Sequence, residues 1–587
     1  HTITDYSNQA WAFRAMDDAT MRSANPWLYT DPDKANSLPV SVLPVGGFYR
    51  ETKYSMESYD FRATASYNNV FGEDHIVNLF GGMETNAVNR EKTWFNGVGM
   101  QYEMGMLPSY DYLYFKQGNE ENAGYYSVDR TRQREVSFFG TGTYSYKGRY
   151  TLNGTVRYEG SNKLGKSRKA RWLPTWNVSA AWNAHEEEFW QSFRDVVSNM
   201  TLKASYSLTA DRGPASVSNS KAIINSYNTW RPFTSMKESG LILSSVENSE
   251  LTYEKKHELN IGAEIGFIDN RINIEADWYT RNNFDLIGLI YTKGTGGQLA
   301  KFANVASMKS SGVEFTVSTR NIKTKDFSWN TDFIFSHTKN EVTDLQSNAS
   351  VMDMISGNGF AMEGYPVRAL FSMDFQGLNE NGYPTFINEK GQLTVSDINF
   401  QEQLKKDHLV YEGPTDPTMT GSLGNIFRYK GFTLNAFITY SFGNVIRLDP
   451  VFHNVYSDLD AMPREFINRW TTGGDEKVTN VPVIADKRAN QQDPYLSYAY
   501  NAYNYSTERI AKGDFIRMKE LSLSYNFPKK MISKLKVNDL SLKIQATNLF
   551  LIYSDKKLNG QDPEFFNTGG VASPVPRQFT LTLRLGI

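Results

Sequence analysis

The sequence predicts an all-β protein, a transmembrane antiparallel β-barrel from which about 15 strands can be recognised. Three observations support this prediction. Many short segments alternate between apolar and polar residues, the apolar faces of these segments carry no charge, and the links between segments alternate between short and long. A helical membrane protein is excluded, because the mean hydropathy is −0.50 and no run approaches the roughly 18 to 20 apolar residues that a spanning helix needs.

Residues 149–158 illustrate the alternation. Their even-numbered positions are Tyr150, Leu152, Gly154, Val156 and Tyr158, and their odd-numbered positions are charged or polar. The pattern recurs at 202–208, 259–267, 272–278, 313–317, 432–440, 540–546 and 579–587. A Lys or Arg at the lipid midplane costs roughly 2 to 4 kcal/mol, whereas the lumen of a barrel accepts charge. We therefore expect the uncharged faces to meet lipid, and the lumen to hold Arg157, Lys203, Glu264, Asp277 and Glu314.

The links separate a barrel from a soluble β-sandwich, whose strands also alternate because one face packs on a core. Short links lie at 68–74, 147–148, 269–270, 321–326 and 430–431, and long ones at 85–134, 209–256, 339–420 and 444–514. Strict alternation of this kind is typical of brief periplasmic turns and extended extracellular loops. Two links on the short side are longer, 183–199 and 528–538. The first predicts a small amphipathic helix that carries Phe189, Trp190, Phe193, Val196 and Val197.

Strand direction predicts the organisation of the chain. Short periplasmic turns place the C-terminus in the periplasm and make the first recognisable strand, 59–67, descend towards it. Barrels of this kind have an even number of strands and both termini in the periplasm, so roughly seven of about 22 strands, with a plug, are expected ahead of it. Residues 1–58 are then an extracellular loop region, and residues 59–587 are the C-terminal part of the barrel. The chain opens at His1 without a signal peptide, so a preceding segment is expected.

Four segments carry a resemblance to a known family. They are GDFIRMK at 513–519, which leads into LSLSY at 521–525 and Phe527-Pro528; ATNLF at 546–550, which is followed by DPE at 562–564; PVPRQFTL at 574–581; and Asn304-Val305 with GVEF at 312–315. These residues resemble the SusC/RagA family of TonB-linked outer-membrane proteins, from about residue 59 to the end. The family's N-terminal domain, TonB-contacting segment and plug have no counterpart in this sequence.

The resemblance implies the pore component of a nutrient importer. A SusD-like surface lipoprotein would cover the extracellular mouth, and TonB–ExbB–ExbD would supply energy through the N-terminal region. The cargo would be an oligosaccharide or an oligopeptide, and no covalent chemistry is implied. A diffusion porin shares every argument from the strands, and an outer-membrane enzyme or adhesin is a further alternative. With a formal net charge of −2 and no basic stripe, a nucleic-acid partner is not expected.

Three short motifs are better explained as structure than as chemistry. Residues 160–167 match the P-loop pattern, but no helix is expected after them to direct its N-terminus at a phosphate. The HEEE run at 185–188 lacks the second histidine of a zinc protease. Residues 379–382 resemble part of a calcium loop but lack its downstream ligands. No cofactor is therefore expected, although calcium in an extracellular loop or in the partner stays open.

Aromatic residues concentrate in the long links and are candidate contacts for substrate or partner, because such rings stack on sugars and anchor interfaces. The candidates are Tyr110, Tyr112, Tyr114, Tyr227, Trp230, Tyr495, Tyr498 and Tyr500. The alternative for each residue is a place in the interfacial girdle or in the packing of the loops.

Overall fold

The computed structural model describes most of the chain. The described residues are 2–5, 28–29, 34, 40–41, 47–101, 104–105, 107–108, 112–120, 125–165, 167–213, 222–228, 239–291, 300–346, 349–452, 464–485, 487–532, 537–565 and 576–586. None of the helices within these ranges is long and apolar enough to cross a membrane.

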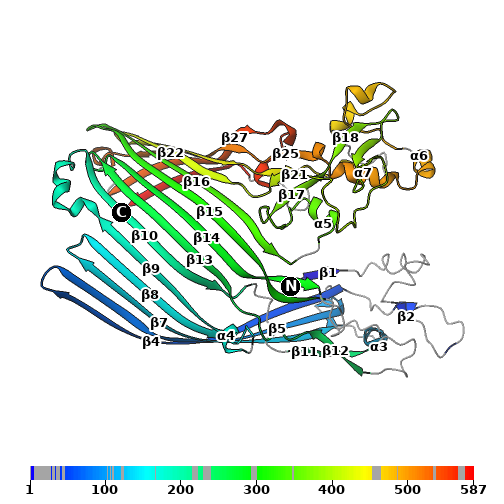
Figure 1. Ribbon diagram of the computed structural model, residues 1–587, viewed down its shortest axis with the longest axis horizontal. Coiled ribbons are helices and arrows are strands. Elements are labelled where there is room, and N and C mark those ends of the chain that lie inside the picture. Colours follow the sequence, from blue (N-terminus) through cyan, green and yellow to red (C-terminus); the bar gives the residue numbers. More distant parts are fainter. Residues whose placement is uncertain are drawn as a thin grey trace.

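One curved antiparallel sheet dominates the structure (Figure 1). It has 17 strands, and 15 remain when the short β1 (Thr2–Asp5) and β6 (Leu107–Pro108) are set aside. The 15 are β4 (Gly47–Phe71), β5 (His75–Gln101), β7 (Tyr126–Tyr146), β8 (Tyr150–Ser161), β9 (Trp172–Asn183), β10 (Val197–Asp211), β13 (Glu254–Phe267), β14 (Ile272–Tyr291), β15 (Ala300–Lys323), β16 (Phe327–Leu345), β22 (Met419–Tyr429), β23 (Phe432–Phe442), β26 (Phe515–Asn526), β27 (Asp539–Ser554) and β28 (Gln578–Gly586). Each pairs antiparallel with the next. The predicted fold class is confirmed.

Short and long links fall at opposite ends of the sheet, as predicted. The C-terminus lies at the short-turn end (Figure 1). At the turn between β7 and β8, Lys147 and Gly148 have φ values of 54° and 68°, as the tightest hairpin turns require.

The strands reach further than the alternation indicated. β5 runs to Gln101 and β7 begins at Tyr126, whereas the whole of 85–134 was expected to be a loop. Register pairing continues as far as Phe95 and Tyr126, because backbone hydrogen bonds do not depend on an apolar face. For the same reason β4 begins at Gly47 rather than at residue 59, so residues 47–58 are strand. The extracellular location of residues 1–58 stays a prediction.

The prediction of a small amphipathic helix in 183–199 is wrong in detail. The link contains two 3₁₀ helices, η2 (Ala184–Glu186) and η3 (Glu188–Ser192). The Trp190 indole donates to the backbone oxygen of Val197 at 2.9 Å, and Val197 already belongs to β10. This bond ties the end of the second 3₁₀ helix to the start of β10. Trp190 is buried, while Phe189, Phe193 and Val196 are exposed.

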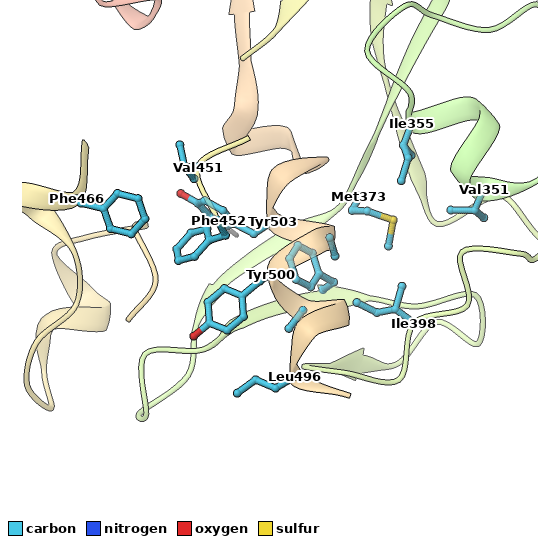
Figure 2. Close-up of a cluster of buried hydrophobic side chains, with 13 residues drawn as sticks. Val351, Ile355, Met373, Ile398, Val451, Phe452, Phe466, Leu496, Tyr500 and Tyr503 are labelled. Atoms are coloured by element: carbon cyan, nitrogen blue, oxygen red, sulfur yellow. The ribbon is translucent and has the colours of Figure 1, made fainter. Parts of the chain in front are cut away.

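Two long links, 346–418 and 443–514, fold together into a lobe beyond the long-loop end of the sheet (Figure 1). The lobe holds the helices α5 (Val351–Ile355), α6 (Lys487–Gln492) and α7 (Leu496–Asn504), and the short strands β17 (Ala369–Met373), β18 (Phe375–Leu378), β19 (Pro384–Ile387), β20 (Leu393–Thr394), β21 (Leu409–Pro414), β24 (Val445–Arg447) and β25 (Ile510–Lys512). Its core contains Val351, Met373, Phe452, Leu496 and Tyr503 (Figure 2). Both links contribute to this core, so neither can fold in this way alone.

Arg447 lies buried where the two links meet. Its guanidinium donates to the Ser372 hydroxyl at 3.1 Å and to the Ser506 carbonyl at 3.2 Å. Burial lowers the pKa of Arg447 to about 10, and burial raises the pKa of the nearby Glu412 carboxyl.

We expect His408 to make the lobe sensitive to acid. Burial lowers the pKa of its imidazole below 6.5, and its Nδ1 is buried without a hydrogen-bond partner among the described residues. Below about pH 6.5 the unfolded lobe therefore binds more protons than the folded lobe, and stability falls as the pH drops. We expect limited proteolysis of the lobe to accelerate between pH 7 and 5. His408→Gln should flatten this dependence, and an unchanged dependence would exclude His408 as its origin.

Candidate functional site

The two faces of the sheet differ in chemistry. One face exposes apolar side chains along most of the strands, among them Leu152, Val156, Ile261, Ile544 and Leu581. Val156 is 52% exposed and Ile544 is 54% exposed, which a water-soluble sheet would not tolerate over so large an area. This face matches the predicted lipid-facing surface.

The opposite face carries the charges. Arg157 Nε lies 2.7 Å from Glu159, and Lys203 pairs with Glu264. Arg212, just beyond β10, pairs with Glu135 on β7 and with Glu159 on β8. Since neighbouring strands are about 4.8 Å apart, β10 and β7 are about 14 Å apart along the sheet. A side chain bridges that separation only on the concave side, so the charged face is the inner one.

A cavity of about 1040 Å³ opens on this inner face near its long-loop end. Its charged lining residues are Arg90, Arg130, Arg132, Arg157, Glu159, Lys163, Asp211 and Arg212. Arg130 and Arg132 border the cavity, although their side chains alternate to the other face of β7. Burial lowers the pKa of Lys163, whose ammonium donates to the Gly213 carbonyl at 3.2 Å. Burial opposes the charge of Arg212 too, but Glu135 and Glu159 outweigh it and raise its pKa. The cavity is thus suited to a hydrated, polar ligand.

Of the charged cavity residues, Arg157 was expected in the lumen from the alternation, but the others were not among the sequence candidates. Arg90, Lys163 and Arg212 come from three different strands or links, and no local spacing brings them together. Only the strand order of the sheet could have located them.

The candidate aromatic residues are not gathered in one place. Tyr112 begins α3 (Tyr112–Glu120) and is exposed, whereas Tyr114 on the same helix is buried. Tyr495 and Tyr498 at the start of α7 are exposed, with ring centroids 5.9 Å apart. In Figure 1, α3 and α7 lie on opposite sides of the long-loop end.

One of the candidates, Tyr500, is part of the packing of the lobe. Tyr500 belongs to the lobe core, and its hydroxyl donates to the Val483 carbonyl at 2.7 Å (Figure 2). Leu496, Ala499, Tyr500 and Tyr503 are all buried, and this i, i+3, i+4, i+7 spacing in the sequence predicts a buried helical stripe. Tyr110, Trp230 and the side chain of Tyr227 lie outside the described residues. Ligand contact by Tyr112, Tyr495 and Tyr498 stays a prediction.

The segments that carried the family resemblance form contacts between distant parts of the chain. Arg517 of GDFIRMK is buried and pairs with Asp562 and Glu564 of DPE, with its Nε 2.7 Å from the Glu564 carboxylate. This pairing ties β26 to the link between β27 and β28. Asn304 holds residue 252, because its amide oxygen accepts from the Thr252 N–H and its amide nitrogen donates to the Thr252 carbonyl, both at 3.0 Å.

The short motifs also have structural roles. The expectation that no helix follows 160–167 is wrong, because Ser167 caps the one-turn α4 (Arg168–Arg171) by accepting from the Ala170 N–H at 3.2 Å. In the turn at 379–382, the Asn379 side chain accepts from the backbone N–H groups of Asn381 and Tyr383. Among the described residues, no three His, Asp or Glu side chains lie close enough to hold a metal ion. Calcium in an extracellular loop stays a prediction.

An antiparallel meander with an exposed apolar outer face and a charged inner face defines the class of transmembrane β-barrel proteins. Residues 3–459 match the family described as TonB dependent receptor-like, beta-barrel. The chain belongs to this family, which consists of transport barrels rather than enzymes.

Two relatives match this chain over most of its length. The chain is 24% identical over 531 residues to TonB-dependent receptor P3 of Formosa agariphila, covering 88% of this chain and 49% of the relative. It is 25% identical over 478 residues to TonB-dependent receptor SusC of Bacteroides thetaiotaomicron, covering 78% of this chain and 44% of that protein. The chain therefore spans about half the length of the curated relatives that it matches. These matches confirm the resemblance to SusC/RagA proteins.

A solved structure confirms the fold. The structure of the RagAB peptide transporter superposes on 92% of this chain and 56% of its own, with a TM-score of 0.74 and 21% sequence identity.

Proposed function

We propose that this chain forms the larger part of the pore of a TonB-dependent importer in the bacterial outer membrane. The observation that carries the proposal is the pairing of an exposed apolar outer face with a charged, cavity-bearing inner face on a sheet of this family. The cargo is an oligosaccharide or an oligopeptide, which the polar inner wall would contact through hydrogen bonds and charge pairs. No chemical step on the cargo is part of the proposal.

The proposed orientation follows from the links. The short turns and the C-terminus face the periplasm, and the lobe and the other long links face outward. A SusD-like surface lipoprotein would cover the lobe side, and TonB–ExbB–ExbD would act on a region preceding this chain. The exposed pair Tyr495 and Tyr498 is the aromatic patch of the lobe available to that lipoprotein or to cargo.

Uptake by cells tests this function. A strain that lacks the gene is complemented with the full-length protein, and entry of labelled oligosaccharides and oligopeptides of matched size is measured. We expect uptake of one class to fall more than about tenfold when the gene or the TonB-contacting segment is removed. Uptake that survives removal of that segment would indicate a diffusion porin. Hydrolysis of either class by the purified protein would indicate an enzyme.

The partner is tested separately. The complex is extracted from the source outer membrane in detergent, and every co-purifying chain is sequenced by mass spectrometry. We expect a surface lipoprotein together with peptides that precede His1, and purification of this chain alone would contradict the proposed assembly.

A further inference from the structure

A row of aromatic rings marks one boundary of the apolar face. Tyr158 stacks on Trp172 with centroids 5.1 Å apart, and the row continues through Trp176, Tyr206 and His257. Aromatic belts of this kind lie at the membrane–water interface. On β8, the interval from Tyr150 to Tyr158 is nine residues, which matches the roughly 9 to 11 residues that cross a bilayer.

Basic residues begin directly beyond this row. Phe138 of β7 pairs with Tyr158, and Val136 pairs with Gly160. The next side chains on the same face of β7 are those of Arg134, Arg132 and Arg130, all exposed.

The one-turn helix α4 continues the basic zone. Its Arg168 and Lys169 are exposed and lie four and three residues before the belt residue Trp172. Because β8 separates β7 from β9, the strand that carries the arginines and the strand that follows α4 are about 10 Å apart across the sheet. Asn162 fixes the end of β8 against β7, since its side chain accepts from the Arg134 N–H at 2.9 Å and donates to the Arg132 carbonyl at 3.0 Å.

Some of these cations have side-chain partners within the protein and others do not. Arg130 pairs with Glu91 at 2.7 Å, and Arg134 donates to Asn89 at 2.7 Å. In the part of the chain that the structure describes, Arg132, Arg168 and Lys169 form no ion pair. We call these three residues the basic rim.

We propose that the basic rim binds the phosphorylated head group of an outer-leaflet lipid. The proposal rests on the membrane position proposed above. Phosphate oxygens accept several N–H donors at once, and basic residues at a membrane surface attract such groups. The exposed Phe138 and Val156 lie on the same face below the rim, where they can contact the acyl chains of the same lipid. A protein partner bound to the basic rim would leave the continuous apolar surface below it uncovered, whereas a lipid would cover both.

Lipid retention by the full-length protein tests the proposal. The protein is purified in detergent, stripped of lipid and titrated with diphosphorylated lipid A, and retained lipid is counted by native mass spectrometry. Loss of each basic residue should weaken binding about fivefold. Arg132→Gln combined with Lys169→Gln should therefore weaken it about 25-fold, and Arg132→Lys with Lys169→Arg should restore it.

The matched control removes two charges on the other face of the same wall. Arg90→Gln combined with Lys92→Gln lies on β5 beside residues 131 and 129 of β7 and should leave lipid A retention unchanged. Equal affinity of wild type and rim variant would overturn the proposal. So would equal retention of dephosphorylated lipid A, or full displacement by millimolar inorganic phosphate, which would indicate a site for the free ion. Since the measurement involves no uptake, its outcome is independent of the importer proposal.

Discussion

Replacing Arg517 with methionine is expected to lower the free energy of unfolding by about 3 to 5 kcal/mol. The Arg517 side chain is 4% exposed and pairs with Asp562, which is 9% exposed, and with Glu564. Removing the cation leaves a carboxylate buried without its counter-charge, and that unpaired charge is the source of the loss. The measurement is chemical unfolding of the detergent-solubilised full-length protein, followed by tryptophan fluorescence.

Lys519 supplies the control for this effect. Its ammonium lies 3.9 Å from the same Glu564, but its side chain is 38% exposed. Exposed pairs contribute at most about 1 kcal/mol, so Lys519→Met should cost far less than Arg517→Met. A similar loss in both variants would show that burial of the pair is not what matters. Adding Asp562→Leu to Arg517→Met should recover part of the loss, because the stranded charge is then gone.

The membrane-facing part of the fold was predictable because lipid imposes a local rule. Along 149–158, every second residue must be uncharged, and the structure places Leu152 and Val156 on the exposed apolar face. Outside the lipid this rule no longer applies, so the sequence shows no alternation that would predict the extension of β5 to Gln101. The alternation of apolar and polar residues predicts the number of strands. Their full lengths depend on backbone pairing between segments that are distant in the sequence.

Local sequence patterns could not predict the contacts between distant motifs or the core of the lobe. The sequence motifs at 513–519 and 562–564 were recognised separately, but only the fold brings Arg517 to Asp562 across 45 residues of chain. For the aromatic candidates, the sequence prediction failed for a different reason. Ring-rich loops predicted exposed contacts, yet Tyr500 is buried in the lobe core because it shares a helical stripe with Leu496 and Tyr503. Periodicity was the signal for that burial, and residue type alone could not supply it.

A positive charge at Val156 should prevent efficient membrane assembly. Val156 lies between the aromatic residues Tyr150 and Tyr158 on the exposed face of β8, two residues from the midpoint of that interval at Gly154. Because the cost of an arginine falls from about 2 to 4 kcal/mol at the midplane to about 0 to 1 kcal/mol at the interface, Val156→Arg should cost about 1 to 2 kcal/mol. The measurement compares the amount of full-length protein in the outer-membrane fraction, and its unfolding free energy in lipid, with those of the wild type.

The adjacent residue makes the comparison specific to the face of the sheet. The Thr155 hydroxyl lies 3.2 Å from that of Thr141 on the inner face, so an arginine at residue 155 meets the polar lumen. Thr155→Arg should change stability by only about 0.5 kcal/mol. The two variants introduce the same side chain one residue apart on the same strand, so strand propensity and total charge cancel between them. A larger loss for Thr155→Arg than for Val156→Arg would reverse the assignment of the faces, and with it the argument that places the charged wall and its cavity inside the pore.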